Sequence, residues 1–338
     1  MNEKVDNKAI HVGIAVNIKT DHFSDTQAEF DEPETILAIS NALKTCGFET
    51  VVLEATDEFT RKLEYEKPDI VFNIAEGKSG RNREAQIPAI LEYFGVPYTG
   101  SDVATLAISL DKSLTKRIVQ NCGIETPPSF FIKKGSLEFP DDLTFPILVK
   151  PNAEGSSKGI SDTCVAENLT QLHKLVHQAM NNYGEDLIAE QYIDGREFTV
   201  GIIGNGSDIH VFEPMEIIFE KFKSYKIYGY EVKKNFRDYI SYQCPPDIPE
   251  KLKTQMMHDA EIVYNTLGCL DFARIDFRLS NDGKVYFIEA NPLPGLAPGY
   301  SDFPMLAAFN GIEYNSLVCK VLYCALKRFG MKAVKENE

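Results

Sequence analysis

The sequence lacks an excess of basic residues, a long apolar run and cysteine pairs at metal-binding spacing. Its 338 residues carry a formal net charge of -15. This charge argues against a general nucleic-acid or anionic-membrane surface, because sequence-independent phosphate binding needs a net basic field. No segment approaches the ~18 apolar residues of a membrane span, and the first residues lack the apolar run of a signal peptide. We therefore expect a cytoplasmic protein that binds neither nucleic acid nor membranes.

The cysteines exclude two further kinds of site. They are odd in number, scattered along the chain, and never at the two-residue spacing of zinc or redox sites. We expect all seven to be reduced thiols of the core: Cys46, Cys122, Cys164, Cys244, Cys269, Cys319 and Cys324.

The first hundred residues alternate between strand and helix patterns. Strands are expected at 11–17, 50–55 and 69–77, with a helix from about Pro33 between the first two. Proline in the first turn and Gly47 after the last apolar residue are typical helix start and stop signals. This order predicts a Rossmann-like domain with a parallel sheet.

The remainder of the chain indicates two further regions. A helical stretch at 103–123 ends at the breaker Pro127-Pro128, and a strand at 145–151, a helix at 168–184 and a strand at 186–194 follow. Strands at 197–204, 271–280 and 285–291 come next, the last two joined by a hairpin turn, and a helix at about 312–329 closes the chain. We predict an α/β and α+β protein with domains at 1–102, 103–188 and 189–338.

Two standard nucleotide-binding motifs are absent. Gly77-Lys78-Ser79 lacks the earlier glycine of a P-loop because Phe72 occupies its place, and no G-x-G-x-x-G follows the first strand. The loop "EGSSKG" at 154–159 contains Glu154, Ser156 and Ser157. Its backbone N–H groups can converge on an anion, which makes it either a flexible phosphate cover or an ordinary hairpin loop.

The segments "ARIDF" and "IEAN" place polar groups on one face of a predicted hairpin. Alternation puts Arg274 and Asp276 on the face opposite Ala273, Ile275 and Phe277, and Glu289 and Asn291 lie on the next strand. Two carboxylates and an amide oxygen are hard ligands suited to Mg²⁺ that bridges ATP phosphates. The alternative is a set of structural ion pairs with Arg274 and Arg278.

Two other segments have weaker signals. His173 and His177 are four residues apart on a predicted helix, but without a third ligand they indicate a solvated helix face. The Lys- and Tyr-rich segment 221–239 is more consistent with a lid that supplies lysines to phosphates than with a nucleic-acid surface, since the chain around it is acidic.

Taken together and in order, six motifs resemble those of the D-alanine:D-alanine ligases of the ATP-grasp superfamily. The resemblance covers roughly residues 68 to 315 and implies an ATP-grasp fold, with a Rossmann-like first domain, a small central lid domain and a C-terminal catalytic domain. The motifs are "GVPYTGSD...SLDK" (95–112), "LVKPNAEGSSKG" (148–159), "EQYIDGREFTVG" (190–201), "YEVKK" (230–234), "ARIDF" (273–277) and "IEANPLPG" (288–295).

The resemblance implies a role for each matching residue. ATP would be bound through its phosphates by Lys112, Lys150, Lys233 and the loop residues Glu154, Ser156 and Ser157, through adenine by Glu190, Gln191 and Ile193, and through ribose by Glu197. Two Mg²⁺ ions, for which Mn²⁺ could substitute, would be held by Asp276, Glu289 and Asn291. Arg274 and the N–H of Gly295 would stabilise a tetrahedral oxyanion, with Ser156 and Lys233 also in the catalytic set.

The substrate half of the resemblance is weaker. The family's glutamate that holds the first amino group has no clean match, so Glu29 or Glu32 would have to substitute, and the family's tyrosine linked to it is replaced by Lys234. The family's "HGxxGE" becomes a segment that contains Glu76, Arg81 and Arg83. The Ser-Leu pair that holds the acceptor carboxylate reads Ser301-Asp302, and this aspartate is expected to repel a free carboxylate by on the order of 1 kcal/mol.

These observations predict an ATP-dependent carboxylate-amine ligase, by resemblance a homodimer, that acts on small amino-acid or peptide substrates. D-Alanyl-D-alanine synthesis is one possible activity. The altered pocket leaves open a different amino acid, a peptide or a specialised metabolite. A nucleotide-binding regulatory protein without turnover is the alternative from another class, which the intact set of ATP and metal residues disfavours.

Overall fold

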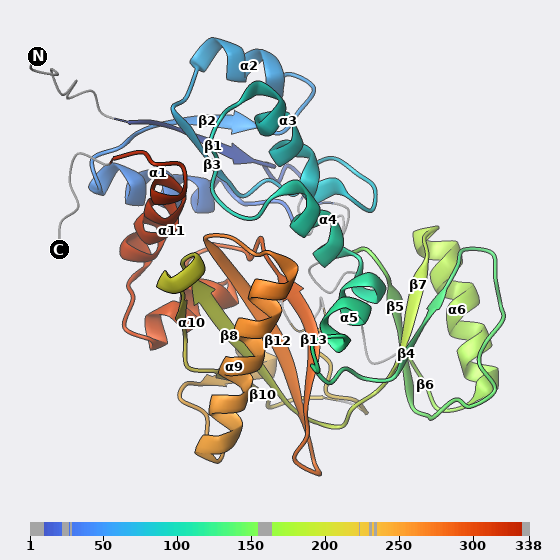
Figure 1. The fold of residues 1–338 in the computed structure, drawn as a ribbon. Helices are drawn as coiled ribbons and strands as arrows, with labels where there is room; N and C mark the ends of the chain where they lie inside the picture. Colours follow the sequence, from blue (N-terminus) through green and yellow to red (C-terminus); the bar gives the residue numbers. More distant parts are fainter. Residues whose placement is uncertain are drawn as a thin grey trace, which may run out of the picture.

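The computed structural model describes residues 10–21, 27, 29–154, 164–222, 224–229, 232 and 235–332. These residues form one parallel and two antiparallel sheets, which lie in three parts of the molecule (Figure 1). The mixture confirms the predicted α/β and α+β fold class. In these ranges, no helix has the length and apolar character needed to cross a membrane.

The first sheet is parallel, has the order β2-β1-β3 and positions two loops of the site. Its elements are β1 (His11–Val16), α1 (Pro33–Thr45), β2 (Glu49–Glu54), α2 (Phe59–Glu66), β3 (Ile70–Asn73), η2 (Arg83–Ala85) and α3 (Gln86–Phe94). Pro33 begins α1 as predicted, and Gly47 just after it has a φ of 86°, a left-handed conformation that glycine adopts without strain. The carboxyl ends of β1 and β3 lead into the loops that carry the site residues of this domain.

The second sheet is antiparallel and has the order β4-β7-β5-β6. Its elements are β4 (Ser129–Ile132), β5 (Ile147–Pro151), β6 (Val165–Ala166), α6 (Leu169–Tyr183) and β7 (Leu187–Gln191). The buried Leu172 and Val176 of α6 pack against this sheet in one apolar cluster, so the predicted strand-helix-strand order is confirmed here.

The stretch predicted as helical at 103–123 forms two helices rather than one. These are α4 (Val103–Leu110) and α5 (Lys112–Gln120), and Asp111 between them is extended, with φ -82° and ψ 94°. The Asp111 carboxylate accepts hydrogen bonds from Leu114 N at 3.0 Å and from Asn152 Nδ2 at 2.7 Å. An aspartate that caps a helix satisfies one of its free N–H groups, so this side chain stabilises a new helix start at Lys112.

The third sheet is antiparallel, with the path β11-β10-β8-β12-β13 and β9 beside β8. Its elements are β8 (Gly195–Ile203), η4 (Gly206–Asp208), β9 (His210–Val211), β10 (Met215–Phe219), α8 (Phe236–Tyr239), β11 (Ile240–Gln243), α9 (Glu250–Leu267), β12 (Phe272–Ser280), β13 (Val285–Asn291), α10 (Asp302–Phe309) and α11 (Tyr314–Arg328). The apolar face predicted for "ARIDF" is confirmed, because Ala273, Ile275 and Phe277 lie in one buried cluster with residues of α9. The opposite face is therefore left for polar side chains.

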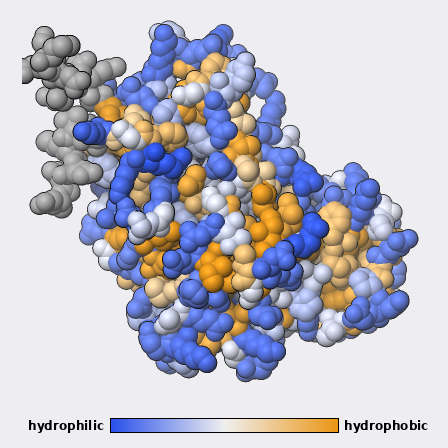
Figure 2. All heavy atoms as spheres, viewed as in Figure 1, coloured by the Kyte–Doolittle hydropathy of each residue, from blue (hydrophilic) through white to orange (hydrophobic). Residues whose placement is uncertain are grey.

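The two ends of the chain meet in one core. Helix α11 lies beside α1 (Figure 1), and the same buried cluster contains Ile39 of α1 and Val318 of α11. Because this cluster combines the first and last parts of the chain, the domain boundaries at 102 and 188 stay predictions. On the face shown in Figure 2, hydrophobic side chains are visible over the middle, around α5 and α9, and the edges are largely hydrophilic.

The expectation that every cysteine is a reduced core thiol is wrong. Cys46, at the end of α1, and Cys319, in α11, form a disulfide with a Cα–Cα distance of 6.6 Å across 273 residues of sequence. Spacing along the chain gives no sign of this pair, because only the packing of α1 on α11 brings the two residues together. Of the free cysteines, Cys269 is buried, whereas Cys122 is exposed.

Candidate active site

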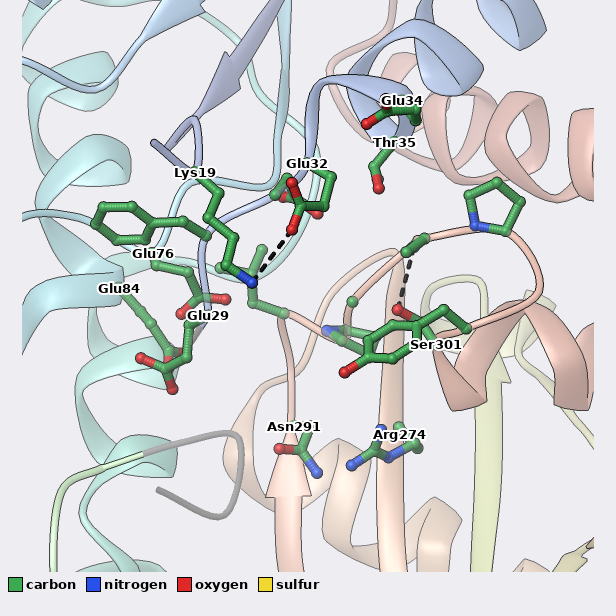
Figure 3. Close-up of a pocket in the computed structure, with 18 of the residues that line it drawn as sticks. Lys19, Glu29, Glu32, Glu34, Thr35, Glu76, Glu84, Arg274, Asn291 and Ser301 are labelled. Carbon is green, nitrogen blue, oxygen red and sulfur yellow. Dashed lines mark hydrogen bonds and ion pairs between the residues drawn. The ribbon is translucent and has the colours of Figure 1, made fainter. Parts of the chain in front are cut away.

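A cavity of about 620 Å³ lies between the loops of the first sheet and one end of the third sheet. The first domain contributes the segment after β1, the start of α1, and Glu76 and Glu84. The third sheet contributes Arg274, Glu289 and Asn291, and the loop from Leu293 to Ser301 closes the cavity. Figure 3 shows side chains from these elements directed toward this shared space.

The β12–β13 hairpin brings the predicted metal ligands together. Asp276 pairs with Glu289 and Arg274 with Asn291 in the strand register, so all four side chains lie near one another on the polar face. Asp276 accepts hydrogen bonds from Asn291 Nδ2 at 3.1 Å and from Thr199 Oγ1 at 2.7 Å. Two carboxylates and an amide oxygen in this arrangement match the hard oxygen ligands that Mg²⁺ prefers.

Some of the structural ion pairs that the sequence offered as an alternative to a metal site are also present. Arg274 donates Nε to Asp276 Oδ1 and Nη2 to Asp276 Oδ2, both at 3.0 Å, whereas Arg278 contacts Glu197 at 3.6 Å. Burial and the neighbouring Glu289 together outweigh Arg274 and raise the pKa of Asp276. Because a bound cation would favour the charged form of this carboxylate, the residues fit a metal ion.

A buried group of charges lies beside the hairpin, on α5, β5 and β7. The Glu190 carboxylate lies 2.9 Å from Lys150 Nζ and 3.2 Å from Lys116 Nζ. Burial opposes ionisation of Glu190, but the two lysines outweigh it and lower its pKa. Burial lowers the pKa of Lys116 to about 8. The sequence analysis missed Lys116, although its position one helical turn after Lys112 was a signal.

Other residues expected to contact ATP have different surroundings. Lys112 Nζ contacts the Glu154 carbonyl oxygen and lies 3.9 Å from Glu289 Oε2. Gln191 ends β7, and Ile193 just beyond it is buried. The remaining members of this set lie outside the described residues and stay predictions: Ser156, Ser157 and Lys233, together with the substrate candidate Lys234.

Asp302, a predicted substrate residue, is not among the residues that line this cavity. It is 5% exposed and lies 3.2 Å from Arg274 Nη1, while Tyr228 and Tyr242 donate their hydroxyls to its Oδ1 at 2.9 and 3.0 Å. Burial and the Asp302 charge raise the pKa of both tyrosines, so they remain protonated donors. The charge of Asp302 is directed at Arg274, which weakens the expected repulsion of an acceptor carboxylate; that repulsion stays a prediction.

Gly295 and Ser301 line the cavity together. A Cβ atom on Gly295 would lie 2.8 Å from Ser301 Oγ, a distance that real Cβ contacts do not show. Ser301 Oγ in turn accepts a hydrogen bond from Ala297 N at 3.1 Å. The absence of a side chain at Gly295 therefore permits the close approach of Ser301.

The two arginines proposed for substrate binding have other contacts. Arg83 is buried and donates Nη2 to both oxygens of Glu29, at 2.7 and 2.9 Å, and Nη1 to the carbonyl oxygen of Ala153 at 2.8 Å. Arg81 is paired with Asp111 at 2.8 Å and its side chain is 61% exposed. Neither arginine lines this cavity, and their contact with a substrate stays a prediction.

The cavity wall formed by the first domain is acidic. Glu76 lines it, as expected, together with Asp31 and Glu84, which the sequence analysis missed. Burial, reinforced by Glu32, raises the pKa of Asp31 to about 7. Burial also raises the pKa of Glu84 to about 7 and raises that of Glu76 well above its ordinary value, with Glu29 and Glu84 adding to the latter shift.

The comparisons with known proteins agree with this geometry. The family model described as D-ala D-ala ligase C-terminus matches residues 118–323. A D-alanine–D-alanine ligase of Aquifex aeolicus is 35% identical over 286 residues, which is 84% of this chain and 92% of the relative. One of Cupriavidus metallidurans is 35% identical over 260 residues, or 76% of each chain. An uncharacterized protein of Sinorhizobium fredii is 33% identical over 296 residues, covering 85% of this chain and 86% of the relative.

A solved structure supports the same fold. The D-alanine–D-alanine ligase from Bacillus anthracis, complexed with ATP, matches 95% of this chain and 98% of its own length with a TM-score of 0.75 and 22% identity. Since the family model and the relatives together cover most of the described chain, this protein belongs to the D-alanine–D-alanine ligase family of ATP-dependent ligases.

Proposed function

We propose that this protein activates a carboxylate with ATP as an acyl phosphate and transfers the acyl group to an amine, with release of ADP and phosphate. The observation that carries the proposal is the polar face of the β12–β13 hairpin. There Arg274, Asp276, Glu289 and Asn291 converge, and all but Asp276 line a cavity large enough for small substrates. In-line phosphoryl transfer depends mainly on such positioning and charge stabilisation.

Two Mg²⁺ ions, or Mn²⁺ in their place, would be held by Asp276, Glu289 and Asn291. When bound, they would neutralise charge on the transferring phosphoryl group. The chain's own contribution is to hold the ligands: Thr199 and Arg274 bind Asp276 from two sides. This support fixes the carboxylate before any cation arrives, as bonds to metal-ligating groups do in general.

The nucleotide would lie beside the buried lysines. Lys112 and Lys150 would contact its phosphates, together with Lys233, Ser156 and Ser157, which lie outside the described residues. Glu190, Gln191 and Ile193 would face adenine and Glu197 the ribose. The contacts of Glu190 with Lys116 and Lys150 support a fixed position of this carboxylate.

The oxyanion formed when the amine attacks would be stabilised by Arg274 and the backbone N–H of Gly295. Arg274 contacts Asp276 on one side and Asp302 on the other. Because Asp302 is buried and the side chain of Asp276 is only 13% exposed, the guanidinium is held in one position and does not have to reorganise during the reaction. Asp302 is thus a positioning residue, which acts through Arg274.

D-Alanine is one candidate for each substrate, since curated relatives of this chain are named D-alanine–D-alanine ligases. The acidic cavity wall supports a different amino acid or peptide equally well. The proposal includes two further points. The protein forms a homodimer, and it acts in the cytoplasm, where ATP is available. Sedimentation and cell fractionation would test these two points.

ADP release with Mg-ATP across a panel of D- and L-amino acids, singly and in pairs, tests the proposal. A mass spectrum of the product identifies the bond that is formed. Glu289→Gln should reduce turnover about 10³-fold, since it weakens a metal ligand worth several kcal/mol, whereas Glu64→Gln on the exposed face of α2 should not. Near-normal ADP formation by Glu289→Gln would refute the metal assignment.

A further inference from the structure

We infer that the cavity binds a carboxylate substrate whose side chain is cationic, an ammonium or a guanidinium, in addition to its α-amino group. The inference rests on the proposed ligase function and names the class of its substrate. It is drawn from the charges that line the cavity and from which of them are already paired within the protein.

Carboxylates outnumber cations on the cavity wall. Seven lining side chains are acidic and two are basic; these are Glu29, Asp31, Glu32, Glu34, Glu76, Glu84 and Glu289 against Lys19 and Arg274. The protein neutralises part of this charge itself, since Glu29 is bound by Arg83 at 2.7 Å and Glu32 by Lys19 at 3.2 Å. Figure 3 shows the second of these pairs at the cavity.

Two more of the seven are accounted for, since Glu289 lies 3.9 Å from Lys112 Nζ and Glu34 is exposed to solvent, so three acidic side chains remain for a ligand. Within the described ranges, Asp31, Glu76 and Glu84 accept no side-chain hydrogen bond and join no ion pair, and Glu84 is only 8% exposed. An ionised carboxylate that leaves water without a partner is costly, and burial accordingly raises the pKa of all three, which the charge of Arg83 offsets only in part at Glu76, and those of Arg83 and Lys112 only in part at Glu84. In the free protein these three carboxyl groups therefore lack a cationic partner at hydrogen-bond distance, and a cation that enters the cavity would supply it.

A metal ion does not explain these three groups. Among the residues that the structure describes, no three His, Cys, Asp or Glu side chains lie close enough to hold one. ATP would add negative charge and increase the mismatch. The ammonium of a neutral amino acid pairs with one carboxylate and leaves two, so a second cationic group on the same substrate fits better.

The position of Glu84 relates this charge to the chemistry. It lines the main cavity and also a small one of about 30 Å³ beside Lys112, Glu289 and Asn291. Glu76 lies close enough to Glu29, Glu84 and Asp31 for their charges to raise its pKa. A substrate that places its carboxylate near Arg274 would therefore direct its other groups along this acidic wall.

The test compares isosteric substrates that differ in charge. ADP release is measured with lysine against norleucine and with arginine against citrulline, in both enantiomers, and binding of the same compounds is measured by calorimetry. A desolvated bond to a charged group is worth about tenfold or more in affinity. We expect kcat/KM to favour the cationic member of at least one pair by about that factor.

Variants of the acidic wall test whether it causes the preference for a cationic substrate. Glu76→Gln should reduce the preference severalfold and leave KM for ATP unchanged, and Glu84→Gln should do the same if Glu76→Gln fails to fold. The exposed carboxylate change Glu64→Gln serves as a matched control and should have no effect.

The outcomes separate this inference from the ligase proposal. If neutral amino acids bind and turn over as well as their cationic isosteres, the substrate class is wrong and the ligase reaction stands. If no compound stimulates ADP release, the ligase proposal fails on this panel, and calorimetry decides the inference alone: equal affinity of lysine and norleucine would overturn it.

Discussion

Replacing Asp302 with leucine, the residue that the family pattern has at this position, should weaken the fold and slow the reaction. The carboxylate accepts two tyrosine hydroxyls and pairs with Arg274 while only 5% exposed. Leucine cannot accept any of these bonds. A buried donor left without an acceptor costs about 1–3 kcal/mol, and breaking a buried ion pair about 3–5 kcal/mol.

The two tyrosine hydroxyls can still bond one another, because they lie 3.0 Å apart. We therefore expect Asp302→Leu to lower the free energy of unfolding by about 3 kcal/mol. Asp302→Asn keeps an acceptor oxygen of the same shape and should lose about 1 kcal/mol. Urea unfolding followed by circular dichroism measures both, which is convenient because the chain contains no tryptophan.

The kinetic part of the prediction concerns Arg274. Without Asp302 the guanidinium is held by Asp276 but no longer from its other side, so kcat should fall about tenfold while KM for ATP changes little. The opposite result would refute this reasoning: an Asp302→Leu protein as stable as the native one, and faster with free amino acids as acceptors. Asp302 would then repel the acceptor carboxylate.

Three further outcomes follow from the buried charges. Lys116→Met removes one of the two lysines at Glu190 and should destabilise the protein by about 3 kcal/mol in urea; an unchanged midpoint would contradict this. Arg83→Met should cost at least as much, whereas Arg81→Ala at an exposed pair should cost under about 0.5 kcal/mol and leave every KM unchanged. The Asp31 pKa is raised to about 7, so the folded protein binds more protons than the unfolded chain between about pH 4 and 7. The free energy of unfolding should fall as pH rises through that range, and Asp31→Asn should make this slope shallower, while the raised pKa of Glu76 and of Glu84 keeps the remainder.

The sequence by itself determined the features that depend on local order. Alternation along "ARIDF" and "IEAN" fixed which side chains share a face, and the strands at 272–280 and 285–291 pair as that pattern required. The start of α1 at Pro33 follows from the fixed φ of proline. The six motifs indicated the family, because their order and spacing can be read from a single sequence without knowledge of the fold.

Only the tertiary structure decided the contacts between distant segments. The Cys46–Cys319 disulfide, the bonds from Tyr228 and Tyr242 to Asp302, and the acidic wall that faces the β12–β13 hairpin all join residues brought together by packing. Spacing along a chain gives no information on such pairs. The sequence shows which residues are charged, but it does not show which distant residue each of them contacts. For that reason the sequence could not show that Asp302 pairs with Arg274.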